Sequence, residues 1–157
     1  MSQRKKIIVG GLGNPLMTDE GIGLEIIHRL MSRSDLPDFI ELMELGSNPM
    51  IVVHAIANRQ KAVLIDCAFM NRPAGILCRF TPDEVISKKT ESPLSLHHPD
   101  LLKALEISQK LGECPEEVVI YGIQPERVTP GDSLSPVLHA RLDDYTETIS
   151  AELSASG

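Results

Sequence analysis

The sequence predicts an α/β protein with a mostly parallel sheet that is covered by helices on both faces. The first observation is a set of short runs that are apolar without alternation, which is typical of strands buried on both sides. Three such runs lie at Lys5–Gly11, Ala62–Ile65 and Val118–Ile123. The second observation is that segments with helical character separate these runs. Strands that alternate with helices form parallel sheets between two helical layers.

The other expected elements complete this alternation. Helices are expected at Asp19–Arg33, Pro49–Ala57, Pro99–Leu111 and Pro136–Leu153. In three of these segments apolar residues recur at helical spacing, and the second follows an Asn-Pro pair that suits a helix start. Two more strands are expected, Phe39–Leu45 and, as a possible edge strand, Gly75–Phe80.

The composition argues against several classes of function. The chain of 157 residues fits one domain, 1–157, and its net charge of −7 provides no general basic face for nucleic acid or an anionic membrane. Aromatic residues make up only 3% of the chain and Trp is absent, which argues against stacking on single-stranded nucleic acid. No apolar run approaches the roughly 20 residues that span a bilayer.

A cytoplasmic monomer with reduced thiols is expected. The basic start of the chain precedes only a short apolar stretch, which Gly and Asn-Pro interrupt, and this does not fit a signal peptide. The three cysteines, Cys67, Cys78 and Cys114, are odd in number and lack CxxC spacing. Free thiols are therefore favoured over a cysteine metal site.

The predicted topology places the functional site at one edge of the sheet. In open α/β sheets, ligands bind outside the carboxyl ends of the strands. The segments that follow the first, third and last buried strands should therefore meet in space. These segments are Gly11–Glu20, Asp66–Cys67 and Ile123–Glu126.

Three residues near this edge carry side chains that bind metals. Glu20 lies where the first turn meets the first helix, Asp66 ends a buried strand, and His97 precedes a later helix. Each also has a structural interpretation, as an acid favoured by the helix dipole, a turn acid, and a solvated or capping histidine. Together they offer oxygen and nitrogen donors for a divalent cation such as nickel or zinc. Three protein ligands would leave coordination sites open for catalysis.

The glycine-rich turn at 11–15 suggests two other functions. Its sequence, GLGNP, lacks the third glycine of the dinucleotide-binding pattern G-x-G-x-x-G, and no P-loop lysine follows. GLGNP also resembles the opening of peptidyl-tRNA hydrolases. That family continues with Thr-Arg-His-Asn and its catalytic histidine, whereas this chain continues with two acids. We interpret the similarity as shared turn geometry rather than shared activity.

Four segments together resemble the hydrogenase maturation endopeptidases, which trim the C-terminal extension of the large subunit of nickel–iron hydrogenases. These segments are GLGNPLMTDEGIG, LIDCAF, LSLHHPDLLKAL and YGIQPERVTPGDSLSP. They occur in the family's order and span nearly the whole chain. The resemblance implies a three-layer α/β/α domain of the phosphorylase/hydrolase-like type, with a twisted, mostly parallel, five-stranded sheet.

The resemblance also implies a site and a substrate. Glu20, Asp66 and His97 match the family's metal-binding cluster. The resemblance implies that this cluster engages nickel carried by the substrate, so that cleavage follows nickel insertion. No tightly bound organic cofactor is implied. The implied partner is a hydrogenase large-subunit precursor, with no nucleic acid and no membrane.

Several alternatives stay open from the sequence. A shift of one residue would make His98 the ligand, although the family match favours His97. Cys67 stands where the family usually has Ala, and is either an extra soft ligand or, as we favour, a packing residue. The substrate's metal would act as a Lewis acid or lower the pKa of a bound water, with Asp66 or Asp19 as general base. A peptidyl-tRNA hydrolase-like esterase and a non-enzymatic nickel-sensing chaperone are the alternative functions.

Two loops near the same edge are also candidates. Gln124-Pro125-Glu126 is either a turn or a wall of the substrate cleft. The segment Thr129–Pro136, with its prolines and Gly131, is expected to be able to close over a substrate tail.

Overall fold

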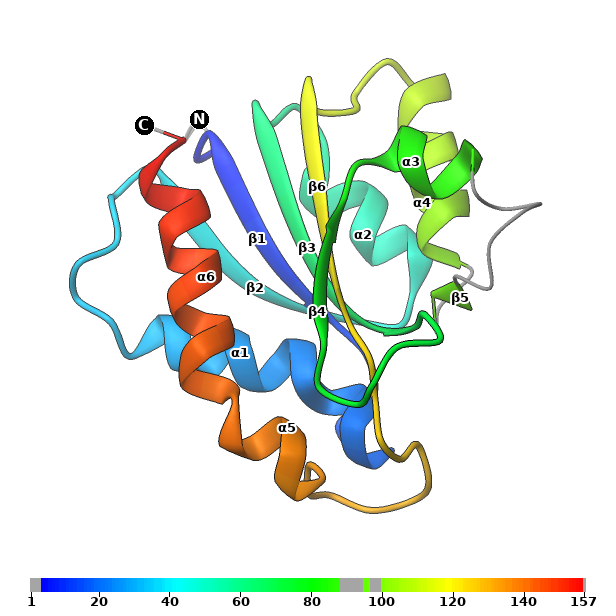
Figure 1. The fold of residues 1–157 in the computed structure, drawn as a ribbon. Helices are drawn as coiled ribbons and strands as arrows, with labels where there is room; N and C mark the ends of the chain where they lie inside the picture. Colours follow the sequence, from blue (N-terminus) through cyan, green and yellow to red (C-terminus); the bar gives the residue numbers. More distant parts are fainter. Residues whose placement is uncertain (1–3, 88–94, 97–99, 157) are drawn as a thin grey trace.

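The computed structural model describes residues 4–87, 95–96 and 100–156 and contains a twisted sheet between two layers of helices (Figure 1). The strands are β1 (Ile7–Leu12), β2 (Ile40–Gly46), β3 (Lys61–Phe69), β4 (Leu77–Phe80), β5 (Ser95–Leu96) and β6 (Glu117–Ile123). The helices are the 3-10 helix η1 (Thr18–Gly21), α1 (Ile22–Met31), α2 (Pro49–Ile56), α3 (Pro82–Ser87), α4 (Asp100–Lys110), α5 (Pro136–Ala140) and α6 (Leu142–Ser154).

The strand order confirms the predicted sheet. The main path runs β2-β1-β3-β6-β4, and the short strand β5 pairs with β3 off this path. The first four strands on the path are parallel, whereas β4 runs antiparallel to β6 at the edge. The five strands of the path therefore form the expected mostly parallel sheet.

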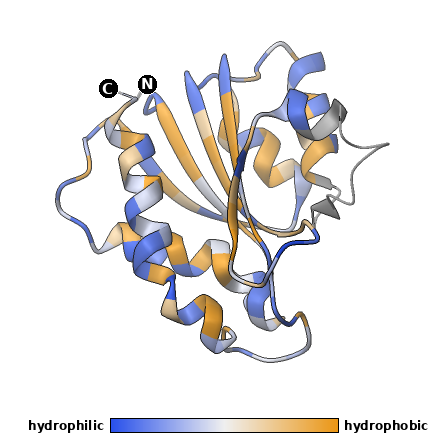
Figure 2. Ribbon diagram, in the orientation of Figure 1, coloured by the Kyte–Doolittle hydropathy of each residue, from blue (hydrophilic) through white to orange (hydrophobic). Residues whose placement is uncertain are grey.

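Two hydrophobic cores lie on the two faces of the sheet. Ile8 and Leu64 face one core, which α2 and α4 cover, whereas Val9 and Val63 face the other, which α1, α5 and α6 cover. Figure 2 shows hydrophobic residues along the central strands and hydrophilic residues on the outer helix surfaces. Because neighbouring residues of a strand point to opposite faces, runs that are apolar throughout fill both cores.

Three details differ from the predicted elements. β3 does not end at Ile65 but continues to Phe69, because its pairing with β6 extends to Cys67 and its last residues pair with β5. The predicted final helix is interrupted at Arg141, which separates α5 from α6. The short elements α3 and β5 were not expected from the sequence.

The cysteines and the helices are consistent with the composition. Cys67, Cys78 and Cys114 are all free thiols, as predicted. Within the described part of the chain, no helix is both long and apolar enough to cross a membrane.

Candidate active site

The turn after β1 places Glu20 at the carboxyl edge of the sheet. Gly13 has a φ of 120°, which favours glycine, and its N–H donates to the carbonyl of Gly46 at the end of β2 (2.9 Å). The side chain of Asn14 accepts from the N–H of Leu16 (2.9 Å), and the N–H of Asn14 donates to Oε1 of Glu20 (3.2 Å). Glu20 is 4% exposed. The turn therefore folds back on itself and fixes the Glu20 carboxylate.

The first turn of α1 is pressed against the ends of two strands. A Cβ atom on Gly23 would lie 2.6 Å from the carbonyl oxygen of Ile65 and 2.7 Å from that of Leu12. Only a glycine permits this approach of the helix backbone to β1 and β3. The close approach brings the turn that carries Glu20 toward the part of β3 that carries Asp66.

Asp66 is a fully buried acid within β3. It lies opposite Gly122 of β6, and its Oδ1 accepts the N–H of Cys67 at 2.8 Å. Burial raises the pKa of Asp66 well above its usual range; the Cys67 N–H opposes this effect, and the charge of Glu20 adds to it. Glu20 and Asp66 are thus two acids that act on each other at one buried site. We call them the acid pair.

Asp19 lies beside the acid pair but has a different environment. Its Oδ2 accepts the N–H groups of Glu126 and Arg127 (both 2.9 Å) and the hydroxyl of Ser135 (2.8 Å). Its Oδ1 accepts the N–H of Ser135 at 2.7 Å. These four donors occupy the acceptor positions of the Asp19 carboxylate and leave none for a water molecule. Of the two general bases considered, the geometry therefore favours Asp66.

The loop between β6 and α5 is held to the turn that carries Glu20. The Thr18 hydroxyl donates to the carbonyl of Arg127 (2.8 Å) and accepts the N–H of Thr129 (3.0 Å). The N–H of Thr18 donates to the carbonyl of Gly131, and the N–H of Gly131 donates to that of Leu16, both at 2.9 Å. Both backbone groups of Gly131, its N–H and its carbonyl, thus bond the segment expected to close over a substrate tail to the turn that carries Glu20. The three segments predicted to meet after the strands do meet here.

Gln124 has a structural role in the neighbouring turn. Its Oε1 accepts the N–H groups of Met70 (2.6 Å) and Arg72 (3.4 Å), and its backbone N–H donates to the carbonyl of Ile76 (2.9 Å). These bonds fix the connection from β3 to β4. They support the interpretation of Gln124 as a turn residue.

Cys67 is a packing residue. Its side chain is fully buried in the core beneath α1 and α6. Burial, followed by the negative charges of Asp66, Glu20 and Asp19, raises the pKa of the Cys67 thiol far above its usual range. A thiol in this state is neither a good nucleophile nor a good metal ligand, because both roles need the thiolate.

The structure thus brings together two of the three predicted ligands. His97 and its alternative His98 lie outside the described residues. Among the residues that are described, no group of three His, Cys, Asp or Glu side chains is arranged to hold a metal ion. The sequence predicted Asp19 only as a possible general base, not as the acceptor of four hydrogen bonds from the loop. The Thr18-Asp19 pair directly before Glu20 was the one signal for this role.

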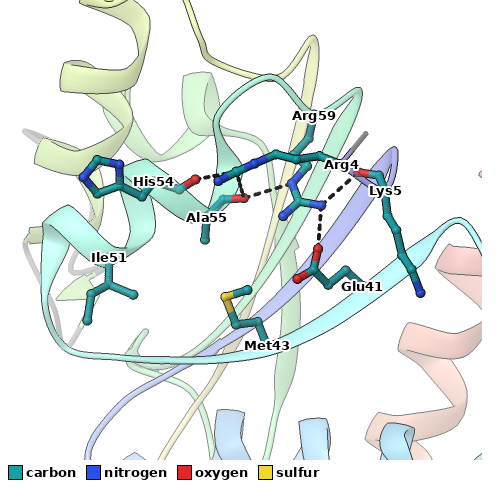
Figure 3. A pocket seen from close by; sticks show the side chains of 8 residues that line it. All are labelled: Arg4, Lys5, Glu41, Met43, Ile51, His54, Ala55 and Arg59. Carbon is teal, nitrogen blue, oxygen red and sulfur yellow. Dashed lines mark hydrogen bonds and ion pairs between the residues drawn. The ribbon is translucent and has the colours of Figure 1, made fainter. Parts of the chain in front are cut away.

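A separate cavity of about 680 Å³ lies between β2 and α2, away from the acid pair (Figure 3). Arg59 donates to the carbonyl of Lys5 (2.9 Å) and to Oε1 of Glu41 (2.8 Å), and Arg4 donates to the last carbonyls of α2. Figure 3 shows both arginines directed into this network. The cavity is lined by Arg4, Lys5, Glu41, Met43, Ile51, His54, Ala55 and Arg59. These polar contacts join the end of α2 to Lys5 and Glu41.

The fold and the acid pair define a class: an α/β/α protein with a carboxylate site at the carboxyl edge of its parallel strands. The family model described as hydrogenase maturation protease matches residues 24–152. The chain is 30% identical over 152 residues to the Hydrogenase 2 maturation protease of Escherichia coli (strain K12), a match that covers 97% of this chain and 93% of that protein.

Solved structures agree with the sequence match. The hydrogenase maturating endopeptidase HybD from E. coli superposes with a TM-score of 0.86 at 31% identity, covering 97% of this chain and 94% of that one. The [NiFe] hydrogenase maturation protease HybD from Thermococcus kodakarensis, at 19% identity, shares the fold with a TM-score of 0.78 over 94% of this chain and 99% of that one. The chain belongs to the hydrogenase maturation protease family and is an endopeptidase.

Proposed function

We propose that this endopeptidase removes the C-terminal extension of a nickel–iron hydrogenase large-subunit precursor after nickel has been inserted. The observation that carries the proposal is the acid pair, Glu20 and Asp66, at the edge of the sheet where ligands of such folds bind. The E. coli relative is named for the maturation of hydrogenase 2, which supports a hydrogenase precursor as the substrate.

The chemistry of the acid pair fits a divalent cation. Two acids at one buried site repel each other, and a cation between them removes this repulsion. In this proposal Glu20, Asp66 and His97 complete the coordination shell of nickel that the substrate carries. Leu96, which precedes His97 in the sequence, is paired with Ala68, two residues beyond Asp66. The choice of His97 as the third ligand is supported by the family resemblance.

The proposed hydrolysis uses the substrate's metal and one carboxylate. The metal polarises the scissile carbonyl or activates a bound water. While it is not a ligand of the metal, Asp66 accepts the proton from the attacking water. Its raised pKa makes it a stronger base than an ordinary carboxylate. Asp19 is excluded from this step by the four hydrogen bonds that it accepts.

The surroundings in which the enzyme works follow from the same features. We propose a single domain over residues 1–157 that acts as a cytoplasmic monomer, without nucleic acid or membrane and without a tightly bound organic cofactor. The net charge of −7 supports the lack of a nucleic-acid partner, and the three free thiols support a cytoplasmic setting.

The proposal is tested with purified precursor, prepared with and without nickel. Cleavage of only the nickel-loaded precursor is expected, with the C-terminal extension as the released product. Equal cleavage of both forms would contradict the proposal that the enzyme recognises the nickel in its substrate. Tight nickel binding by the isolated protein without any cleavage would instead favour the chaperone alternative.

The ligand assignment needs a paired comparison. His97→Ala is expected to abolish processing while the domain stays folded, whereas His98→Ala should have a milder effect. The reverse ranking would move the ligand to His98. Circular dichroism of both variants checks that neither result reflects unfolding.

A further inference from the structure

The Asp19 carboxylate forms the densest polar contact beside the acid pair. It is fully buried and accepts hydrogen bonds from three backbone N–H groups and one hydroxyl, all from the segment Glu126–Ser135. Charge-assisted hydrogen bonds of this kind are roughly twice as strong as neutral ones. Asp19 therefore fixes the loop between β6 and α5 to η1, although the bonded residues lie more than 100 positions apart in the sequence.

The same turn carries Glu20 in another direction. Asp19 and Glu20 are consecutive residues of η1, yet one interacts with the loop and the other with Asp66. Thr18, which begins this helix, has a φ of 48°, a conformation that is costly for a β-branched residue. Its hydroxyl bonds to Arg127 and Thr129 hold it in that conformation. The backbone that carries Glu20 is thus held by bonds made at Thr18 and Asp19, and the Glu20 carboxylate itself accepts the N–H of Asn14.

We propose that Asp19 is a positioning residue, which holds Glu20 against Asp66 and fixes the loop Glu126–Ser135 as one wall of the substrate site. The inference rests on the proposed function. Asp19 touches neither metal nor substrate in this scheme. Its effect on cleavage passes through Glu20 and through the loop.

The main test replaces the carboxylate by an amide of the same shape. In Asp19→Asn, one of the two oxygens becomes an NH₂ group, which faces an N–H donor and cannot accept from it. We expect kcat/KM for nickel-loaded precursor to fall by about 10–100-fold, the cost of displacing a catalytic group by about 1 Å. Amide hydrogen exchange at Glu126, Arg127 and Ser135 should accelerate. The shape of the pH profile should stay unchanged, because no proton-transfer group is lost.

A second variant keeps the test decisive if Asp19→Asn does not fold. Ser135→Ala removes one of the four donors and leaves the three backbone N–H bonds. It should show a smaller loss of kcat/KM and a smaller acceleration of exchange, in the same residues. Asp144→Asn, at an exposed aspartate of α6, is the matched control and should behave like the wild type.

The outcomes separate this inference from the proposed function. Faster exchange in Asp19→Asn with unchanged kcat/KM would overturn the positioning role. An unchanged Ser135→Ala would do the same if the first variant is unfolded. Loss of the acidic limb of the pH profile would make Asp19 a general base and also overturn it. If the wild type fails to cleave nickel-loaded precursor, the proposed function fails and this inference falls with it.

Discussion

A Cβ atom on Gly13 would stand 2.0 Å from the carbonyl oxygen of Glu20. Gly13 also has a φ of 120°, so an alanine there would be both strained and in collision with backbone. We expect Gly13→Ala to lower the free energy of unfolding by at least about 2 kcal/mol and to abolish processing. Urea unfolding and precursor cleavage measure the two effects.

Gly112 provides the control for Gly13. It has a φ of 69°, but open space surrounds the position of its missing Cβ. Gly112→Ala should therefore cost only about 1–2 kcal/mol, the price of the left-handed conformation, and should leave cleavage intact. Equal effects of the two substitutions would contradict the collision at Gly13.

Asp66→Asn is expected to stabilise the fold and to end processing. Burial raises the pKa of Asp66, the Cys67 N–H opposes this, and the charge of Glu20 raises the pKa further. Between the ordinary and the raised pKa the folded state binds more protons than the unfolded state, so stability falls as pH rises through that window. The variant lacks this loss. Its gain in unfolding free energy over the wild type should be near zero below about pH 4 and grow above it.

Urea unfolding at pH 4 and pH 7 measures the difference for Asp66→Asn. Asp144→Asn, at an exposed site, should show the same small difference at both pH values. If the variant were less stable than the wild type by the same amount at both pH values, ionisation of Asp66 would not destabilise the folded state, and the prediction would be wrong.

Glu152→Gln should respond to pH in the opposite direction. Burial raises the pKa of Glu152, but hydrogen bonds from Arg79, Lys61 and Tyr121 outweigh it and lower the pKa to about 2. A lowered carboxyl pKa adds stability above the ordinary value, and this stability is lost as pH falls toward 2. The variant should be about 2 kcal/mol less stable at pH 7, where charged hydrogen bonds are lost.

The deficit of Glu152→Gln should shrink as pH falls from about 4.5 toward about 2. Unfolding by urea at a series of pH values follows this trend. Glu147→Gln, which removes an exposed partner of Arg33, should change stability by less than about 1 kcal/mol at any pH. A deficit that stays constant across the range would exclude ionised Glu152 as its source.

Cys67→Ala should retain processing. The thiol is fully buried and its pKa is raised, so it does not supply a nucleophile. The loss of one buried sulfur should cost roughly 1 kcal/mol of stability. Cleavage of nickel-loaded precursor by the variant is the measurement. Abolished cleavage by Cys67→Ala and Cys67→Ser, both folded, would instead indicate a thiol protease.

The architecture of the sheet was predictable from the sequence, because strands buried on both faces leave an unmistakable run of apolar residues. The boundaries of the strands and helices were less predictable. The sequence has an acid at Asp66, which normally ends a buried strand, yet β3 continues because β6 and β5 supply hydrogen-bond partners for its last residues. The break at Arg141 was hidden because α5 and α6 share one apolar periodicity along their length.

The site was predictable only as a meeting of segments. The parallel topology was sufficient to bring the turn at Glu20 near Asp66, since both follow or end strands at the same edge. The sequence did not separate the roles of Asp19 and Glu20, two adjacent acids of similar chemistry. That separation depends on which donors surround each carboxylate, and these come from Glu126–Ser135, far away in the sequence. The place of His97 in the cluster still rests on the family resemblance.

The two ends of β3 differ in their electrostatic surroundings. At its first residue, Lys61 bonds to Glu152 of α6 (2.7 Å), so unlike charges lock the strand to a helix. Toward its other end, Asp66 has the like charge of Glu20 nearby. A cation that arrives with the substrate relieves the repulsion at one end while the other end stays anchored. Binding of a nickel-loaded precursor should therefore raise the melting temperature of the enzyme itself. Recognition of the metal can then be measured as an increase in the stability of the fold.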